Sequence, residues 1–428
     1  MRVLLYLGFS VALLCLVVFA DHEGKKHDHK HDHEKKGDHQ DHHHDHHHDH
    51  KHHNHDDKIL SINKISAGNK KFAFDLFSEI VADHPEENIV ISPVSISVSL
   101  AFLSLGAKGT THDQIIEGIG FNISETPKKE FDDGFHDLQE MLNDDDRELH
   151  LDSGNGLFVS QAWKIKEDFL NKAKSLRSEA FVVNFEENEE AKKQINDYVE
   201  KNTNGKIVDV LSNVNKDAAL IFVNFIYFRG KWEKPFDEKF TKEGDFHVNK
   251  NLTVKVPFMS KTGFYKVAEL DEATLVSVPY KGNASALFIL PKEGKMKEVE
   301  SHQSDLVRKF ISHCQRTLVD LSIPKFTVAG DVDLKKVLPK MGIVDMFSNS
   351  ADFSGITGAP DLKISQAVHK VKINVDERGS EAAGATVMEA VPTSLPPQIT
   401  FDHQFLYNVY DHVTKNVLFL GKVVNPEN

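Results

Sequence analysis

Cysteine is nearly absent from this chain, which has two cysteines among 428 residues. Cys15 lies within an apolar N-terminal run that is expected to be removed, so only Cys314 remains in the mature protein. One cysteine cannot form an internal disulfide, and the fold must therefore depend on its hydrophobic core for stability. Cys314 follows the helical pattern "SDLVRKFISHCQ" without an identifiable activating partner, which favours an idle thiol over a catalytic nucleophile.

Long apolar runs are missing after the first twenty residues. The run "MRVLLYLGFSVALLCLVVFA" has one basic residue, an apolar core and a small residue at Ala20, and it is short for a membrane span. This pattern predicts a signal peptide over residues 1–20 and a secreted, soluble mature protein. Three Asn-X-Ser/Thr triplets, which are acceptors for N-glycosylation in secreted proteins, agree with export. They are at Asn122, Asn251 and Asn283.

An excess of positive charge is also absent. The formal net charge is -14 at pH 7, which argues against nonspecific binding to a nucleic-acid backbone. The chain contains no P-loop, GxGxxG, HExxH or nucleophile-elbow motif. None of these motifs supplies a catalytic residue, and the charge and the lack of later apolar runs predict no nucleic-acid or membrane partner.

Histidine, in contrast, is concentrated in one segment, residues 21–58, which also contains many Asp and Lys residues. The segment has no apolar residue to bury, and we predict that it is disordered. Neutral imidazoles at close spacing suit zinc, copper or nickel, so one interpretation is weak metal capture, and the other is a solvating tail. The candidate ligands are His42, His43, His44, His46, His47 and His48. No cofactor other than weakly bound zinc or copper is expected.

The globular part begins near Ile59. In "NKKFAFDLFSEIVADH", Phe72, Phe77 and Ile80 lie on one helical stripe, and His84-Pro85 is expected to end this amphipathic helix. Residues 220–228 are apolar on both alternating faces apart from Asn224, which predicts a strand buried from both sides. Helical patterns dominate the first half and strand patterns the second, which indicates an α+β fold without strict alternation.

The stretch "GSEAAGATVMEAVPTSLPPQ", residues 379–398, is rich in small side chains. If residues 380–392 formed a strand, one face would contain no charge, because Glu381 and Glu389 both lie on the opposite face. The stretch is therefore patterned to become a strand with one face on a core. The alternative is an exposed loop that has small residues because nothing packs on it.

Five stretches identify a family. They are "NIVISPVSISVSLAFLSLGAKGTT" (88–111), "SGNGLFVSQAW" (153–163), "FVNFIYFRGKWEKPF" (222–236), "HKVKINVDERGSEAAGA" (369–385) and "LFLGKVVNP" (418–426). The chain resembles the serpins, most closely the alpha-1-antitrypsin-like plasma group, over nearly everything after the histidine-rich segment. The resemblance implies an α+β fold in one domain, residues 59–428, with three β-sheets and about nine helices. It also implies a monomeric plasma protein that is not an enzyme and that has an exposed reactive-centre loop at about residues 377–398.

The resemblance further implies a suicide-substrate mechanism against a serine protease. The protease attacks the carbonyl of Thr393, the Thr393-Ser394 bond is cut, and the loop inserts into the main sheet while the protease is still acylated. The positions that match the hinge of inhibitory members are Glu377, Gly379, Ser380, Ala382, Ala383, Gly384 and Ala385. Asn224 and Ser92 are interpreted as buried hydrogen-bonding residues of the region where the sheet opens.

Thr393 differs from the arginine or large apolar residue that this position has in many inhibitory members. A short, uncharged side chain fits only a small specificity pocket, which argues against trypsin-like targets. An elastase-like protease and the loss of any meaningful target both remain open.

The second hypothesis is a plasma carrier. The Thr-Ser pair and "YDHVTK" resemble the hormone-carrier serpins, such as corticosteroid-binding globulin. The implied pocket lies between a helix over residues 304–313 and the turn near residue 411. Its candidate residues are Val307, Arg308, Ile311, Tyr407, Tyr410, Asp411, His412 and Lys415. A carboxylate beside tyrosine rings favours a lipophilic amine such as an alkaloid, unless Lys415 already pairs with Asp411.

Overall fold

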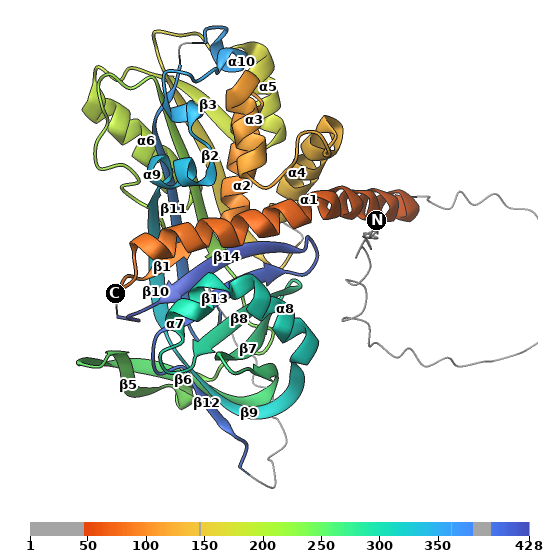
Figure 1. The fold of residues 1–428 in the computed structure, drawn as a ribbon, viewed down its shortest axis with the longest axis vertical. Coiled ribbons are helices and arrows are strands. Elements are labelled where there is room, and N and C mark those ends of the chain that lie inside the picture. The colour runs from red at the N-terminus through yellow and green to blue at the C-terminus, as the bar shows by residue number, and fades with distance from the viewer. Residues whose placement is uncertain (1–46, 145–146, 361, 380–394, 428) are drawn as a thin grey trace, which may run out of the picture. The chain divides into compact units, whose positions relative to one another are not determined.

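The computed structural model describes residues 47–144, 147–360, 362–379 and 395–427, with side chains from residue 55 onward. The chain divides into two units, Met1–Asp49 and His50–Asn428, and the second contains the fold described below. Helices and two mixed sheets make up this unit (Figure 1), which confirms the α+β class.

A five-stranded sheet contains the strand that was predicted to be buried on both sides. Its strands, in spatial order, are β10 (Phe326–Asp333), β11 (Ile364–Val375), β4 (Leu220–Arg229), β2 (His150–Ser160) and β3 (Ser178–Val183). Every residue of β4 before Arg229 is buried, as its two apolar faces require. Strands β4 and β11 are parallel neighbours, whereas β4 and β2 are antiparallel.

Helices cover both faces of this sheet. On one face, Ile195 and Val199 of α6 (Asn188–Asn202) share a core cluster with Ile221 and Val223 of β4. On the other face, α2 (Pro93–Ser104) belongs to the main core together with Phe222. Alternate residues of β4 thus enter two different cores, which explains why its sequence has no polar face.

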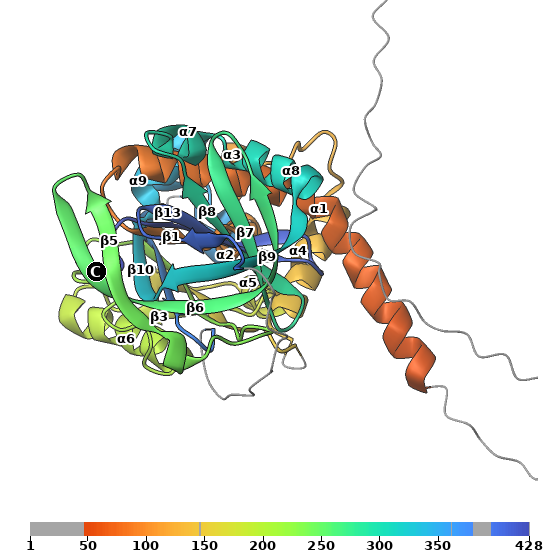
Figure 2. The ribbon, with the colours of Figure 1, turned by 90° about the horizontal axis from the view of Figure 1, so that it is seen from below.

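The remaining strands form a nine-stranded network that contains two sheets. One part comprises β1 (Ile89–Ile91), β14 (Asn416–Val423), β13 (Phe405–Asp411), β8 (Ala284–Pro291) and β7 (Ala273–Tyr280). The other comprises β5 (Lys242–Asn249), β9 (Gln315–Pro324) and β12 (Gln398–Thr400). The long strand β6 (Leu252–Glu269) belongs to both parts, since it pairs with β5, with β9 and, through its last four residues, with β7 (Figure 2). Two of the three expected sheets are therefore joined through β6, and the strands form two continuous sheets.

The described residues contain ten α-helices, close to the nine expected. Besides α2 and α6 they are α1 (His47–Asp83), α3 (Gly109–Gly118), α4 (Lys128–Leu142), α5 (Glu167–Ser175), α7 (Met296–Ser301), α8 (Gln303–His313), α9 (Leu334–Val337) and α10 (Ser354–Thr357). Three short 3-10 helices accompany them: η1 (Glu238–Phe240), η2 (Leu338–Met341) and η3 (Asp345–Phe347). None of the helices in this part of the chain combines the length and the apolar composition that crossing a membrane requires.

Helix α1 matches the sequence at its end and differs at its start. Phe72, Phe77 and Ile80 are buried, and the helix ends at Asp83, just before His84-Pro85. Residues 47–58, however, were assigned to a disordered tail, and they continue α1 as helix. These residues include neither glycine nor proline, so a helix that begins beside the core can extend through them at little cost. Residues 21–46 of the predicted tail lie outside the described residues.

Candidate functional site

The two ends of the predicted reactive loop are attached to different sheets (Figure 1). On the N-terminal side, β11 leaves the five-stranded sheet at Val375. On the C-terminal side, β12 pairs with the edge strand β9, and the N–H of Asp320 donates a hydrogen bond to the carbonyl of Pro397 at 3.0 Å. Leu395, the first described residue after the loop, is 99% exposed. Thr393, Ser394 and the hinge positions Ser380, Ala382, Ala383, Gly384 and Ala385 lie outside the described residues.

The described part of the hinge is a tight turn from Asp376 to Gly379. The N–H of Gly379 donates to the carbonyl of Asp376 at 3.2 Å, and the N–H of Asp376 donates to the carbonyl of Gly379 at 3.1 Å. Gly379 has φ +105°, and a Cβ atom there would lie 2.3 Å from the carbonyl oxygen of Gly230. Only glycine fits both this backbone conformation and this close approach. The geometry of the turn therefore explains why residue 379 is glycine, independently of any role of this residue in loop insertion.

Glu377 is buried beneath this turn. Its carboxylate accepts a hydrogen bond from Thr241 Oγ1 at 2.6 Å and pairs with Lys325 Nζ at 2.9 Å. Burial alone would raise the pKa of Glu377, but the bonds from Thr241 and Lys325 outweigh burial and hold the pKa below its ordinary value. The hinge is thus fastened by a charged side chain whose partners come from the segments before β5 and between β9 and β10.

Trp232 anchors the same turn from the end of β4. Its indole Nε1–H donates to the carbonyl of Asp376 at 2.9 Å, and its backbone N–H donates to the carbonyl of Arg378 at 3.0 Å. The indole is fully buried and stacks on the ring of Tyr280, with the centroids 4.1 Å apart and the planes 9° from parallel. Tyr280 in turn shares a hydroxyl hydrogen bond with Tyr407. The loop base therefore rests on an aromatic stack between the two sheets.

The strands between which a loop would insert, β4 and β11, are paired over eight residue pairs, from Ile364 with Leu220 to Lys372 with Tyr227. At the centre of this pairing, His369 Nδ1–H donates to Asn224 Oδ1 at 2.5 Å. The N–H of Ser92 donates to His369 Nε2 at 3.0 Å, which fixes the neutral tautomer. Burial lowers the pKa of His369 to about 3.

This polar network continues behind the sheet. Asn224 Nδ2 donates to Ser95 Oγ of α2 at 2.7 Å and to Asn155 Oδ1 of β2 at 2.8 Å. Asn155 Oδ1 also accepts from Ser99 Oγ, and its amide nitrogen donates to Ser178 Oγ at 3.2 Å. Asn224 and Ser92 are buried hydrogen-bonding residues, as expected from the sequence. The network holds four adjacent strands, β11, β4, β2 and β3, to helix α2, and opening the sheet between β4 and β11 must disrupt it.

Sequence reasoning missed several residues of this site. Thr241 and Lys325, the partners of Glu377, are more than fifty residues from it along the chain, and nothing in their local sequences indicates this pairing. Trp232 and His369 lie inside the quoted family stretches, and that position was the one signal that could have identified them. Hydrogen-bond partners between distant segments leave no periodic trace in a single sequence.

The candidate ligand residues do not converge on one pocket. On α8, Arg308 and Ile311 are exposed and Val307 is half-buried, while Tyr407 and Asp411 of β13 are buried. Asp411 forms an ion pair with Arg147, whose guanidinium donates to both carboxylate oxygens at 2.7 and 3.1 Å. Lys415 is exposed and does not occupy this role.

The other two residues of the turn also have partners. His412 Nε2 lies 2.8 Å from Ser285 Oγ, and burial lowers the pKa of His412. The hydroxyl of Tyr410 accepts from the side-chain amide of Asn408 at 3.3 Å.

A cavity of about 420 Å³ lies beside α7 and α8 and includes Arg308 from the candidate set. Its lining residues are Glu272, Glu298, Val299, His302, Asp305, Leu306, Arg308, Lys309 and Ser312. Asp305 pairs with Arg308, and Glu272 pairs with Lys309. The cavity therefore has a charged rim around the side chains of Val299 and Leu306.

The predicted modification and metal positions are only partly described. Asn122, Asn251 and Asn283 are exposed, so each is accessible to a glycosyltransferase. His42, His43, His44 and His46 lie outside the described residues, and the side chains of His47 and His48 are not described either.

The fold and the loop base define a class of protein, and comparison with known proteins agrees. The family model for serpins, described as serine protease inhibitors, matches residues 67–426. This chain belongs to the serpin family, which is described as a family of serine protease inhibitors and is not a family of enzymes.

Curated relatives and solved structures refine the comparison. Alpha-1-antiproteinase of Rattus norvegicus is 45% identical over 377 residues, which cover 87% of this chain and 92% of that protein. The protein of the same name from Callosciurus caniceps is 47% identical over 370 residues, with 85% and 89% covered. Human thyroxine-binding globulin, solved with its hormone, superimposes with a TM-score of 0.81 at 39% identity and covers 86% of this chain and 99% of its own.

Proposed function

We propose that this protein is a secreted plasma inhibitor of an elastase-like serine protease, acting as a suicide substrate cut between Thr393 and Ser394. The observation that supports this most directly is the five-stranded sheet. Its parallel strands β4 and β11 are adjacent, and the loop begins where β11 ends, at the Gly379 turn. A strand that turns back at Gly379 and enters between β4 and β11 would run antiparallel to both, because these two strands are parallel to each other.

In this mechanism the protease serine attacks the carbonyl carbon of Thr393, and the nitrogen of Ser394 leaves with a proton, giving an acyl-enzyme. Residues 380–392 then enter the sheet while the protease is still bound, with their uncharged face inward. The bound protease is carried along and distorted before water can hydrolyse the ester. The native sheet is a kinetically trapped state in this proposal.

The test is a complex that survives denaturing electrophoresis. The full-length protein is incubated with pancreatic and neutrophil elastase, chymotrypsin and trypsin, and a Thr393→Arg variant serves as the matched specificity control. We expect a stable complex of the wild type with an elastase-like enzyme and a shift of complex formation to trypsin in the variant. Cleaved wild-type protein without any stable complex, across all four proteases, contradicts the inhibitor proposal.

A carrier function is the second candidate, favoured by the likeness to thyroxine-binding globulin and by the cavity beside α8. Because the buried Asp411 is already paired with Arg147, an amine ligand at the turn must compete with a partly buried guanidinium. Asp305 at the cavity rim is half-buried and pairs with Arg308 of its own helix, which is exposed, so Asp305 is the more accessible acid. A lipophilic amine would place its apolar body against Val299 and Leu306.

Equilibrium binding of a lipophilic amine, a steroid and an iodothyronine to the wild type tests this candidate. The variants Asp305→Asn and Asp411→Asn distinguish the cavity from the turn. Tight amine binding that is weakened by one of these substitutions supports a carrier of amines. Preference for the iodothyronine or the steroid, or amine binding unchanged in both variants, refutes the amine assignment.

A further inference from the structure

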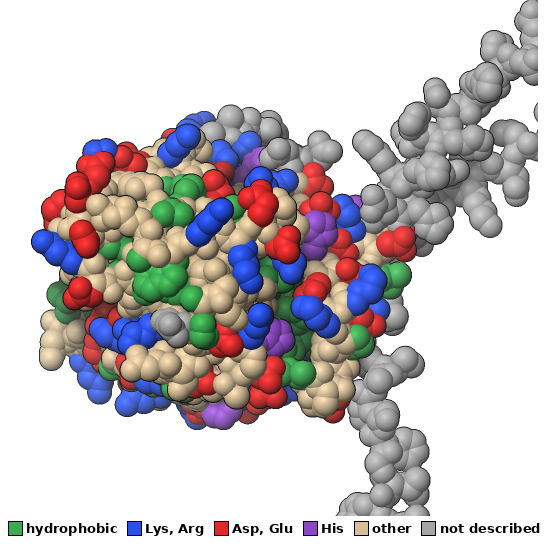
Figure 3. Space-filling model, turned by 90° about the horizontal axis from the view of Figure 1, so that it is seen from above, with side chains coloured by type: hydrophobic (Ala, Val, Ile, Leu, Met, Phe, Trp, Pro, Cys, Tyr) green, Lys and Arg blue, Asp and Glu red, His purple; other side chains and the backbone are tan. Residues whose placement is uncertain are grey.

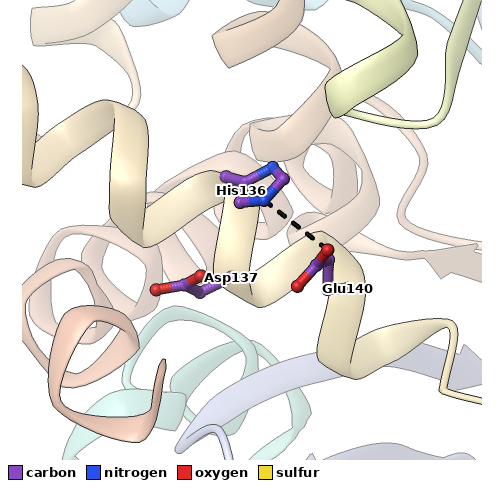
Figure 4. Close-up of side chains that lie close together, drawn as sticks. All are labelled: His136, Asp137 and Glu140. Atoms are coloured by element: carbon purple, nitrogen blue, oxygen red, sulfur yellow. Dashed lines mark ion pairs between the residues drawn. The ribbon is translucent and has the colours of Figure 1, made fainter. Parts of the chain in front are cut away.

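We propose that His136, Asp137 and Glu140 on helix α4 form a binding site for a zinc ion in the folded domain, separate from the histidine-rich segment. One ligand atom from each of these side chains lies within 4.8 Å of those of the other two. Figure 4 shows the three side chains along α4, with the imidazole of His136 facing Glu140. The site lies far from the reactive loop in sequence, and neither candidate function uses it.

The spacing on α4 suits one metal ion. His136 and Glu140 are four residues apart and Asp137 and Glu140 are three apart, and both separations place side chains on the same face of a helix. Imidazole and carboxylate are both zinc ligands, and three protein ligands leave a fourth tetrahedral position for water. The exposure of all three side chains is intermediate, so an ion can reach them from solvent.

The orientation of His136 is fixed from a different helix. Its Nδ1 lies 2.9 Å from the carbonyl oxygen of Ser175, the last residue of α5. A carbonyl only accepts hydrogen bonds, so Nδ1 must bear the proton, and in the neutral ring Nε2 presents a lone pair. Metal-binding histidines are typically held in this way by a hydrogen bond from the other ring nitrogen.

The gap between His136 and Glu140 has the width that a zinc ion needs. His136 Nε2 and Glu140 Oε1 are 3.6 Å apart, which is too long for a hydrogen bond. Zinc bonds of roughly 2.0–2.1 Å at a tetrahedral angle place two ligand atoms about 3.4 Å apart. In the neutral ring two electron-pair donors thus face each other at a separation close to that spanned by a bound cation.

Lys58 of α1 should influence the affinity of the site for zinc. Its Nζ pairs with the other carboxylate oxygen of Glu140, Oε2, at 2.6 Å, which leaves Oε1 for the metal. Arg177 adds a second positive charge near Glu140. Both cations repel a divalent ion, so removing Lys58 should strengthen zinc binding. Lys58 is itself the last residue of the histidine-rich segment, so this increase is a specific signature of the α4 site only in a protein whose segment histidines have been replaced.

The experiment uses the full-length chain with every histidine of residues 21–58 replaced by asparagine, so that the segment no longer binds metal. Zinc chloride is titrated calorimetrically into this background and into four further variants: His136→Asn, Glu140→Gln, Lys58→Met and His112→Asn. The last is a matched control, since His112 lies 3.1 Å from the carboxylate of Asp113 but belongs to no group of three ligands among the described residues. Circular dichroism establishes that each variant is folded.

We expect one zinc ion per chain in the background protein, with affinity at least tenfold lower in His136→Asn and in Glu140→Gln. Lys58→Met should bind more tightly, and His112→Asn should be unchanged. Zinc should also raise the melting temperature of the background protein, because the three ligands adopt this geometry only in the folded state. No uptake by the background protein, or uptake unaffected by both His136→Asn and Glu140→Gln, overturns the proposal.

Discussion

Cleavage of the loop should raise the melting temperature of this protein, by an amount that follows from the strand pairing. Insertion breaks the ladder between β4 and β11 and makes two new ladders, one on each side of the inserted strand. The net gain is one ladder, and the existing one spans eight residue pairs. At about one hydrogen bond per pair and about 0.5–1.5 kcal/mol each, the gain is roughly 4–12 kcal/mol.

This free energy can be converted into a temperature. An unfolding entropy of about 2.1 cal/mol/K per residue gives roughly 0.8 kcal/mol/K for a unit the size of His50–Asn428. The melting temperature should therefore rise by about 5–15 °C. The entropy lost in ordering residues 380–392 is opposed by burial of their uncharged face, so the hydrogen bonds set the scale.

The assay is differential scanning calorimetry before and after limited cleavage at the loop. Ser380→Arg places a charge on the inward face of the new strand and should abolish the rise. Glu381→Arg is the matched control, because its neighbouring position points outward and the rise should persist. An unchanged melting temperature after cleavage of the wild type, or the same rise in both variants, would refute the insertion argument.

The remaining predictions concern described residues. Gly379→Ala should destabilise the native protein by about 2 kcal/mol in denaturant unfolding and favour cleavage over complex formation, because the added Cβ would overlap the Gly230 carbonyl. The control is Gly294→Ala, since Gly294 also has a positive φ, +75°, but has open space around it. Burial lowers the pKa of His369 to about 3, so the unfolded chain binds a proton that the folded chain does not as pH falls below about 6.5. This residue should therefore cost roughly 2 kcal/mol of stability at pH 5, and a His369→Gln variant whose stability falls just as steeply between pH 7 and pH 5 would contradict the assignment. Asp411→Asn should cost about 3 kcal/mol in urea unfolding by leaving Arg147 unpaired, and a second substitution, Arg147→Met, should recover part of the loss.

The elements with strong periodic patterns were predictable from the sequence. The apolar stripe of α1 and the two apolar faces of β4 report burial directly, since side-chain period and solvent exposure are linked. The start of α1 was missed because charged and histidine residues without glycine or proline are compatible with both helix and disorder.

The residues of the site were predictable only where they belong to a short continuous stretch of sequence. Gly379 could be singled out because it begins the small-residue stretch, whereas Glu377 matched the family hinge without any indication of Thr241 or Lys325. Asp411 was expected to be free or paired with nearby Lys415, and it is paired with Arg147, which precedes it by 264 residues. Local sequence distance is a poor guide to ion pairs in a fold in which non-consecutive strands are neighbours in both sheets.

The short pairing of β12 with β9 has a consequence for how long the protein keeps its activity in storage. This strand is joined to β9 by three residue pairs, Gln398 to Thr400, at the edge of its sheet. If those few pairs separate, the uncut loop gains the slack that cleavage would otherwise provide, and the sheet can close around it with no protease present. On the proposed mechanism, such a molecule would be folded and more stable than the native form, yet unable to inhibit a protease. Storage losses should therefore track the fraying of one short edge strand, and they would escape any assay that measures only how much protein remains folded.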